Sequence, residues 1–206
     1  EQNSDMILFT GDIVNTDAKE MHPWLETFNR IKKHEYGKYS VLGNHDYGEY
    51  VTWPSEKDKA DNFQAIKDLY GKIGFTLMLN EHTYIEKGND KIALIGVENW
   101  GHNFKKAGDI NKASQDVAQD DFKILMSHDP SHWDYEIKNH VKNFHLTLSG
   151  HTHGMQFVYA QWAGLYENLG RYVYVNRGFG FHAYPGRVGI MPEITVIELK
   201  KGKNVA

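Results

Sequence analysis

Two histidines flanked by glycines occur in the stretch Gly150-His151-Thr152-His153-Gly154. The pair follows an apolar run over residues 144–148, which is typical of a buried strand. Glycines on both sides allow a tight turn that brings the two imidazoles into one small volume. Because neutral imidazole is a common ligand of divalent transition metals, this stretch is a candidate metal site. Solvated loop histidines are the alternative interpretation of the pair taken alone.

Three other apolar runs end in the same kind of polar cluster. Residues 6–10 lead to Gly11-Asp12, residues 39–42 to Gly43-Asn44-His45-Asp46, and residues 122–126 to Ser127-His128-Asp129-Pro130. Taken alone, an aspartate after a strand is more often a helix N-cap or a turn residue, and Asp12 fits that interpretation too. The repetition favours a functional interpretation, because α/β folds place their sites at the carboxyl ends of strands.

The four clusters together could hold divalent cations. Asp12, Asn44, His128 and His151 would offer one cation two oxygen and two nitrogen ligands. His153 would serve a second cation, with Asp12 bridging the two. Two metal ions about 3.5–4 Å apart lower the pKa of a shared water and stabilise the oxygens of an in-line displacement. This arrangement suits phosphoester hydrolysis, in which charge must be stabilised on the transferring phosphoryl group.

The remaining sequence predicts the elements that carry these clusters. Helices are expected over residues 20–34, 60–73 and 133–141, and strands over residues 75–78, 82–86, 92–97, 171–175 and 194–199. Gly88-Asn89-Asp90 predicts a hairpin turn, and Trp24 is expected in the apolar stripe of the first helix. Residues 155–169 are aromatic and irregular. Trp100 and His102 either line the rim of a pocket or pack as part of a surface loop.

Bulk composition narrows the class of protein. The chain has 206 residues, 40% of them hydrophobic and 24% charged, which predicts one globular domain over residues 1–206. A net charge of −4 argues against a stable nucleic-acid partner. No apolar run has the length needed to cross a bilayer, and the absence of cysteine excludes thiolate metal ligands.

In their order along the chain, the clusters resemble the calcineurin-like metallophosphoesterases. The signature blocks of that family are D-x-H, G-D, G-N-H-[DE], a later histidine and G-H-x-H, and this sequence contains the last four in order. Together with Ser-His-Asp-Pro and Asn176-Arg177-Gly178, they are most similar to a branch of bacterial, often membrane-associated phosphohydrolases. The resemblance implies an α/β fold, an α/β/β/α sandwich of two packed mixed β-sheets flanked by helices, with its first strand missing from this sequence.

The resemblance also implies a role for each site residue. Asp12 would bridge two divalent ions, Asn44, His128 and His151 would complete the second metal site, and His153 would belong to the first. Nitrogen and oxygen ligands without sulfur are compatible with Mn, Fe, Zn, Co or Ni. A hydroxide bridging the two ions would be the nucleophile. The implied activity is hydrolysis of a phosphomonoester or phosphodiester.

Further residues are implicated in binding and proton transfer by the same resemblance. His45 would contact the phosphate and protonate the leaving oxygen, and Asp46 would hold the His45 ring by a hydrogen bond. Asn176 and Arg177 would contact the substrate. Small-molecule, nucleotide and lipid-linked phosphoesters are all compatible substrates. A non-catalytic interaction domain, or a metal-binding domain, that keeps the fold is the alternative function.

Two departures from the family pattern lead to further expectations. The D-x-H block is missing, so we expect an incomplete first metal site, weak or absent activity of residues 1–206 alone, and a natural protein that begins before Glu1. Membrane association would then depend on a segment absent here. Relatives often carry a longer loop after G-H-x-H, so part of the substrate-facing rim is expected to be missing after Phe157.

Overall fold

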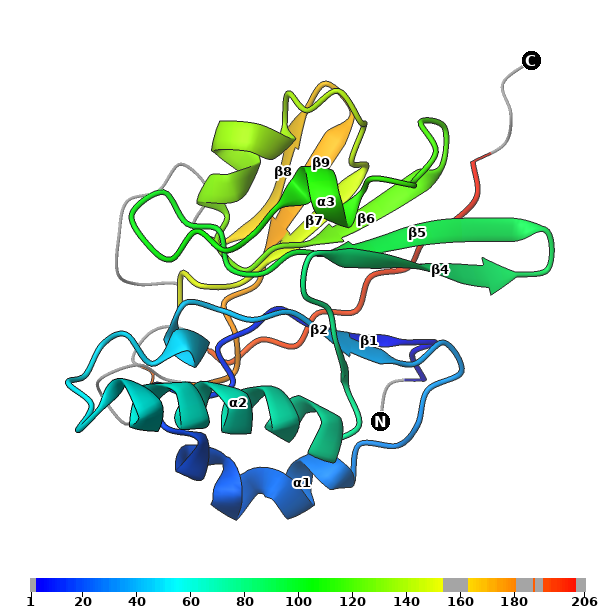
Figure 1. Cartoon of the computed structure of the whole chain (residues 1–206). Helices are drawn as coiled ribbons and strands as arrows, with labels where there is room; N and C mark the ends of the chain where they lie inside the picture. Colours follow the sequence, from blue (N-terminus) through cyan, green and yellow to red (C-terminus); the bar gives the residue numbers. More distant parts are fainter. Residues whose placement is uncertain (1–2, 154–162, 181–186, 188–190, 203–206) are drawn as a thin grey trace.

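Two β-sheets form the centre of the computed structural model, which describes residues 3–153, 163–180, 187 and 191–202 (Figure 1). The smaller sheet has the order β1-β2-β3, with β1 at Ile7–Phe9, β2 at Lys38–Ser40 and β3 at Thr76–Leu77. Both of its strand pairs are parallel. Because the carboxyl ends of parallel strands meet at one edge, the loops after β1 and β2 are brought together.

The larger sheet has the order β4-β5-β6-β7-β9-β8. Its strands are β4 (Glu81–Lys87), β5 (Asp90–Gly96), β6 (Phe122–Met126), β7 (Leu146–Ser149), β8 (Gly164–Asn168) and β9 (Arg171–Val175). The four inner strands β5, β6, β7 and β9 are parallel, and the edge strands β4 and β8 are antiparallel to their neighbours. This sheet is therefore mixed, whereas the three described strands of the smaller sheet are all parallel.

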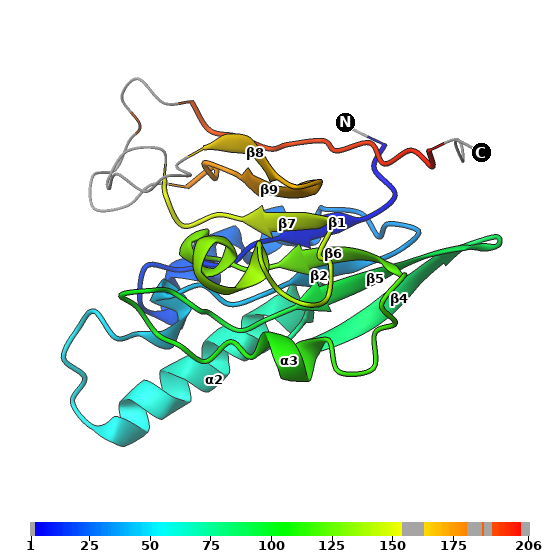
Figure 2. The same ribbon diagram turned by 90° about the horizontal axis from the view of Figure 1, so that it is seen from above.

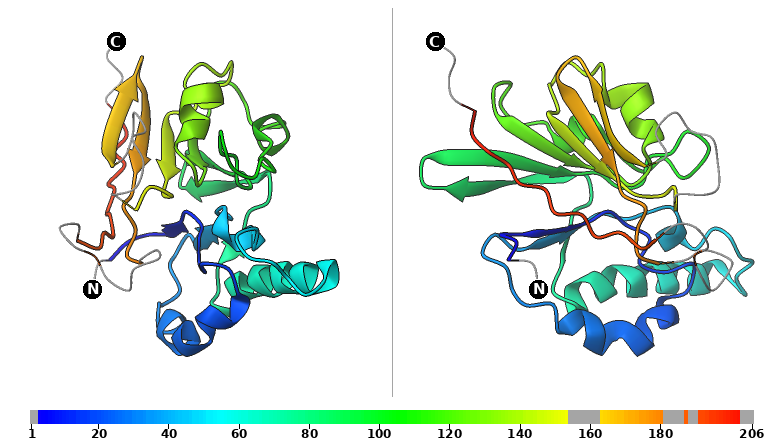
Figure 3. Two further views of the ribbon diagram at one scale, coloured as in Figure 1. Left: turned by 90° about the vertical axis from the view of Figure 1, so that its left-hand side faces the viewer. Right: turned by 180° about the vertical axis from the view of Figure 1, so that it is seen from behind.

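Helices cover the outer face of each sheet (Figures 1 and 3). The 3-10 helix η1 (Ala18–Trp24), α1 (Leu25–Asn29) and α2 (Glu56–Lys72) lie on the side of the smaller sheet. The larger sheet is covered by α3 (Ile110–Ala113) and a π-helix (Trp133–Ile137), and a 3-10 turn η2 (His45–Tyr47) follows β2. The expected α/β architecture of two packed sheets flanked by helices is confirmed.

Alternation along the strands explains how both faces of a sheet are buried. In β5, Ala93 and Ile95 pack in a cluster with residues of α3 and the π-helix, whereas Leu94 packs in the cluster between the two sheets. Successive side chains of a strand point to opposite faces, so one apolar strand contributes to both cores. Leu8 of β1 and Ile124 of β6 meet in the same inter-sheet cluster. This packing fixes the two sheets, and therefore their loops, relative to each other.

Several predicted elements are confirmed with small shifts in their bounds. The helix expected over residues 60–73 is α2, which begins earlier because Ser55 accepts a hydrogen bond from the Asp58 N–H as its N-cap. Gly74, with a φ of 77°, follows this helix. Gly88 and Asn89 form the turn between β4 and β5, as predicted. Strands β6 and β9 have the predicted bounds.

Two predicted helices are wrong in extent. The helix expected over residues 20–34 is the 3-10 helix η1 followed by the single turn of α1, and it ends at Asn29. Pro23 lies inside it and lacks the N–H that a continuous α-helix would need. Trp24 is 57% exposed rather than part of a core stripe. The helix expected over residues 133–141 is shorter, a π-helix that ends at Ile137.

Two predictions about strands are wrong, because a strand forms only where a neighbouring strand can pair with it. Residues 194–199 alternate in polarity, yet the structure assigns them no strand, and Ile194 is 82% exposed. They belong to an extended stretch, residues 191–202, on the side of the molecule that carries β8 (Figure 2). Strand β8 was missed within the stretch interpreted as irregular. It pairs with β9 through a turn in which Leu169 and Gly170 both have positive φ.

The structure also bears on membrane crossing. Within the described part of the chain, no helix combines the length and the apolar character that a membrane span requires.

Candidate metal centre

Two loops from the smaller sheet approach each other so closely that both need glycine. A Cβ on Gly43 would lie 2.1 Å from Asp12 Oδ1, and one on Gly11 would lie 2.5 Å from the Gly43 nitrogen. Gly11 also has a φ of 95°, which favours glycine. Asp12 itself has a φ of 58°, an uncommon conformation that turns its side chain back across the strand ends. The glycines therefore allow Asp12 to lie against the loop that carries Asn44.

Asp46 stabilises this junction of loops. Its Oδ2 accepts hydrogen bonds from the N–H groups of Asp12 and Gly43 and from the Tyr70 hydroxyl, at 3.0, 2.9 and 3.0 Å, and its Oδ1 accepts one from the Ile13 N–H at 3.0 Å. The side chain is completely buried, and burial together with the negative charge of Asp12 raises the pKa of Asp46 to about 7. The sequence predicts that Asp46 holds the His45 ring; the hydrogen bonds of its carboxylate described here go to the Asp12 loop, Gly43 and Tyr70.

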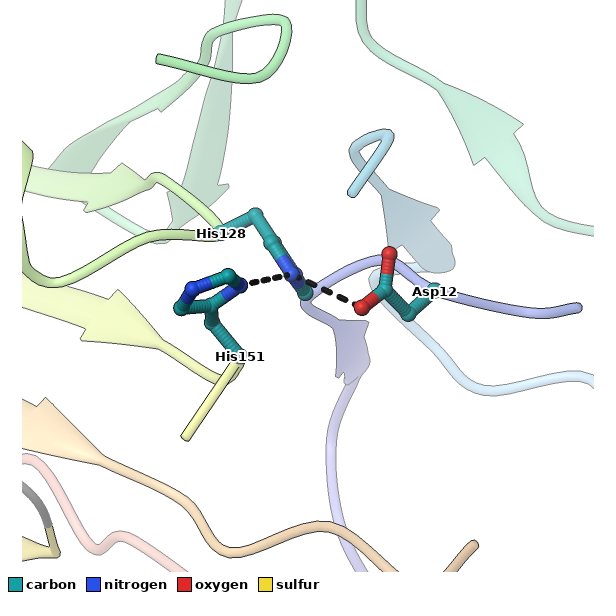
Figure 4. Close-up of side chains that lie close together, drawn as sticks. All are labelled: Asp12, His128 and His151. Carbon is teal, nitrogen blue, oxygen red and sulfur yellow. Dashed lines mark hydrogen bonds and ion pairs between the residues drawn. The ribbon is translucent and has the colours of Figure 1, made fainter. Parts of the chain in front are cut away.

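Four side chains from four strand ends converge on one point (Figure 4 shows three of them). His128 Nε2 lies 3.0 Å from Asp12 Oδ2, 3.1 Å from Asn44 Oδ1 and 3.2 Å from His151 Nδ1. Asn44 Oδ1 lies 2.7 Å from His151 Nδ1. Such short separations among oxygen and nitrogen donors are compatible with the edges of a metal coordination shell.

The donor set fits a divalent ion. Asp12 Oδ1 accepts a hydrogen bond from the His45 N–H at 2.9 Å, and the buried Oδ2 is paired with His128 Nε2 at 3.0 Å, a partner that it would exchange for a bound cation. A buried carboxylate oxygen is costly unless a donor or a cation compensates it. Among the described residues, Asp12, His128 and His151 form a cluster whose ligand atoms lie within 4.8 Å of one another. Asn44 adds a neutral oxygen to this cluster.

The protonation of the two histidines differs. Burial alone would lower the pKa of His128, but the adjacent Asp12 carboxylate raises it to about 9. Burial and the nearby His128 lower the pKa of His151 to about 4. The positive His128 in turn holds the pKa of Asp12 well below its usual range, against the effect of burial. Because a histidine must be neutral at the ligating nitrogen, metal binding here would displace the proton of His128.

Main-chain and side-chain partners orient two of the candidate ligands. His128 Nδ1 donates to the Thr10 carbonyl oxygen at 2.6 Å, which directs Nε2 toward the centre. The Asn44 amide donates through Nδ2 to the Tyr50 hydroxyl at 2.6 Å, which directs Oδ1 toward the two histidines. Sequence reasoning missed Thr10 and Tyr50. A carbonyl group carries no signal in the sequence, and Tyr50 is separated from the Asn44 cluster by a loop.

His45 lies at the edge of this centre. Its Nδ1 lies 2.7 Å from the Asn15 carbonyl oxygen, so Nδ1 is a donor, and its ring lies 4.5 Å from the Tyr50 ring. Nε2 is then the nitrogen that can carry a proton to a bound group. The His45 main-chain N–H donates to Asp12 Oδ1 at the same time, so this residue is bound directly to a candidate ligand.

Other predicted site residues are placed differently. His153 has a φ of 49° and is not among the described cluster of Asp12, His128 and His151. Asn176 Nδ2 binds the Thr195 hydroxyl at 2.9 Å, and Arg177 Nε binds Glu193 at 2.8 Å, so both contact the extended stretch 191–202. The expected loop difference after Phe157 lies outside the described residues.

Trp100 and His102 pack rather than line a rim. The Trp100 ring is buried and stacks on His132 at 4.8 Å, and the His102 ring stacks on Tyr135 at 4.2 Å. Of the two interpretations open from the sequence, the structure therefore supports loop packing.

Glu193 is expected to make stability depend on pH in acid. Although burial opposes it, hydrogen bonds from Arg177, Tyr174 and Thr195 lower the pKa of Glu193 to about 2 from 4.5. The stabilisation is therefore present above pH 4.5 and is lost as the pH falls through 2. We expect Glu193→Gln to unfold more easily than the unchanged protein at pH 7, with a difference that shrinks between these pH values. Urea unfolding at several pH values measures it, and a difference that grows in acid would contradict this assignment.

Comparison with known proteins identifies the family. The sequence profile of the calcineurin-like phosphoesterases matches residues 1–155. The metallophosphoesterase YkuE of Bacillus subtilis is 31% identical over 97% of this chain, which spans 69% of that protein. A Danio rerio transmembrane protein with a metallophosphoesterase domain is 26% identical over 98% of this chain and 47% of its own length.

A solved structure shares the fold. The sulfate thiohydrolase SoxB of Thermus thermophilus superposes with a TM-score of 0.53 at 12% identity, over 82% of this chain and 33% of that one. The present chain thus spans about a third of that protein. The profile match covers all four clusters at the centre and reaches through the histidine pair. This chain belongs to the calcineurin-like phosphoesterase family.

Proposed function

We propose that this protein hydrolyses a phosphomonoester or phosphodiester at the centre formed by Asp12, Asn44, His128 and His151. The observation that carries the proposal is the convergence of these four donors around buried Asp12 Oδ2. A divalent ion held there supplies Lewis acidity, which activates water and neutralises phosphoryl charge. The oxygen and nitrogen donors admit Mn, Fe, Zn, Co or Ni. We further propose that His153 contributes to a second ion.

His45 is proposed to contact the phosphate and to protonate the leaving oxygen. Its Nδ1 donates to the Asn15 carbonyl, so the ring would give a proton to the leaving oxygen from Nε2, in its doubly protonated imidazolium form. Tyr50 and Asn15 hold the ring from two sides. The main-chain contact of His45 with Asp12 keeps the proton donor next to the candidate ligands. In this proposal, one set of side chains binds the cation and a different residue, His45, donates the proton.

The test is hydrolysis of p-nitrophenyl phosphate and of bis(p-nitrophenyl) phosphate by the full-length natural protein with added Mn²⁺. We expect turnover that EDTA abolishes and that Asn44→Ala removes together with Mn²⁺ binding. Tight metal binding without turnover of any ester would instead favour the alternative, a metal-binding or interaction domain. Turnover that persists undiminished in Asn44→Ala would place the chemistry elsewhere.

His45→Ala is expected to lower kcat by about 10²–10³-fold on an alkyl phosphate ester, the range typical of general acids. The loss should be smaller on the p-nitrophenyl ester, because that leaving group needs little protonation. His22→Ala, at an exposed position on η1, is the control and should leave both rates unchanged. Equal losses on the two esters would assign His45 to phosphate binding alone.

Substrate class and location follow from the family branch and are proposals. Small-molecule, nucleotide or lipid-linked phosphoesters would each present a phosphoryl group to the same centre. The transmembrane relative carries a domain similar to this chain, so we propose that association with a membrane would be mediated by sequence outside residues 1–206. Hydrolysis of a lipid-linked ester in vesicles, compared with the free headgroup ester, would test this preference.

A further inference from the structure

A second carboxylate, that of Asp129, lies beside the His151 ring. Asp129 follows His128 directly and its side chain is completely buried. Its Oδ1 accepts a hydrogen bond from the Ser131 N–H at 2.8 Å, whereas its Oδ2 is buried without a hydrogen-bond partner. Removing a carboxylate from water costs several kcal/mol unless a donor or a charge compensates it. The position of Asp129 Oδ2 therefore needs a physical reason.

His151 supplies that reason. Its Nε2 lies 3.6 Å from Asp129 Oδ2, and its Nδ1 is the nitrogen that faces Asn44 and His128. A neutral imidazole that binds a cation through Nδ1 must carry its proton on Nε2. That N–H then points toward the Asp129 carboxylate. The two histidines of the centre thus use opposite nitrogens, since His128 is held through its Nδ1 by the Thr10 carbonyl.

The surrounding structure makes room for this contact. A Cβ on Gly101 would lie 2.5 Å from Asp129 Oδ2, so glycine at this position allows the carboxylate to occupy its place. Phe104 packs edge-on against the His151 ring at 4.8 Å. His151 has a φ of 68°, so its own backbone does not adopt a relaxed strand conformation. Packing and charge together therefore determine the orientation of the ring.

We propose that Asp129 is a positioning residue, which accepts the Nε2–H of His151 and thereby directs Nδ1 toward the cation. This role rests on the proposed metal centre. It assigns to the Asp129 carboxylate the task of fixing the tautomer of His151. Such carboxylate–histidine pairs typically change metal affinity by about 10–100-fold when broken. Asp129 makes no contact with the substrate in this assignment.

The experiment compares Asp129→Asn with the unchanged protein by calorimetric titration of Zn²⁺. The Ser131 N–H keeps the amide oxygen at the Oδ1 position, so the amide N–H₂ faces His151 Nε2 and favours the wrong tautomer. We expect Zn²⁺ affinity to fall by about 10–100-fold. In the Zn²⁺-bound protein, ¹⁵N NMR should show the His151 Nε2–H resonance shift in Asp129→Asn, because this N–H loses its carboxylate acceptor.

Two further variants separate positioning from general damage. Gly101→Ala leaves Asp129 in the chain but displaces its carboxylate, and it should weaken Zn²⁺ binding in the same direction. Asp121→Asn removes another buried carboxylate, one that binds Tyr84 and Lys91, and should lower stability without changing Zn²⁺ affinity.

The experiment distinguishes failure of the proposed function from failure of the positioning role. An unchanged protein that binds no Zn²⁺ would overturn the proposed function. An unchanged His151 Nε2–H resonance in the Zn²⁺-bound protein and unaltered Zn²⁺ affinity in Asp129→Asn and Gly101→Ala would overturn the positioning role alone.

Discussion

Asp46→Ala is expected to lower the free energy of unfolding of the metal-free protein by about 4 kcal/mol or more. The substitution leaves three main-chain N–H groups and the Tyr70 hydroxyl without their acceptor. Each buried donor left unsatisfied costs about 1–3 kcal/mol. Because a typical domain is stable by only about 5–15 kcal/mol, this loss would unfold a large fraction of the protein. Urea unfolding in EDTA measures the change.

Two matched variants test whether the carboxylate is the cause. Tyr70→Phe removes one donor and keeps the acceptor for the other three, so it should cost about 1 kcal/mol. Asp46→Asn should be intermediate, since one end of the amide can still accept while the other presents N–H groups to a donor. Equal urea midpoints for Asp46→Ala and Tyr70→Phe would show that Asp46 does not stabilise the Asp12 loop.

Metal affinity should respond to Asp46 as well. The carboxylate holds the N–H groups of Asp12 and Gly43 together, and Asp12 is a candidate ligand. Asp46 therefore acts on the centre through Asp12, although it contacts neither His128 nor His151. This distinguishes it from the predicted partnership with His45, in which loss of Asp46 would impair proton transfer and leave metal binding intact.

The sequence was sufficient to indicate the centre because of one property of parallel strands. The polar clusters after β1 and β2 must lie at one edge of the smaller sheet, and those after β6 and β7 at one edge of the larger sheet, because each pair of strands is parallel. Asp12 beside Asn44, and His128 beside His151, could therefore be predicted from position alone. The meeting of the two pairs depends on how the two sheets pack against each other. The fold class followed from the resemblance to the family, which the profile match confirms.

The remaining features depend on contacts between residues distant in sequence. Asp46 lies next to His45, yet its hydrogen bonds go to a loop more than 30 residues earlier. The alternation of residues 194–199 predicted a strand, but alternation does not provide a neighbouring strand. From the sequence, Asp129 could be identified only as part of a Ser-His-Asp cluster. Its contact with His151 depends on the pairing of β6 with β7.

Gly43→Ala is expected to abolish the centre with a single added methyl group. Its Cβ would lie 2.1 Å from Asp12 Oδ1 and 2.6 Å from the Asp12 nitrogen, so main chain as well as side chain must move. Asp12 lies 3.0 Å from His128, so moving Asp12 would break this contact. A displacement of about 1 Å at a reacting centre can lower the rate by about 10²-fold. We expect Mn²⁺ binding and ester hydrolysis to fall by about 10²-fold or more.

Gly71→Ala is the matched control, because it adds the same methyl group where nothing lies within 4 Å. Gly71 is inside α2, where alanine is favoured over glycine by about 0.5–1 kcal/mol, so this variant should be slightly more stable and fully able to bind Mn²⁺. If Gly43→Ala binds Mn²⁺ as tightly as Gly71→Ala, the loops after β1 and β2 can separate without consequence. The close approach of Asp12 to Gly43 would then have no part in holding the cation, and the ligand set would have to be sought without Asp12.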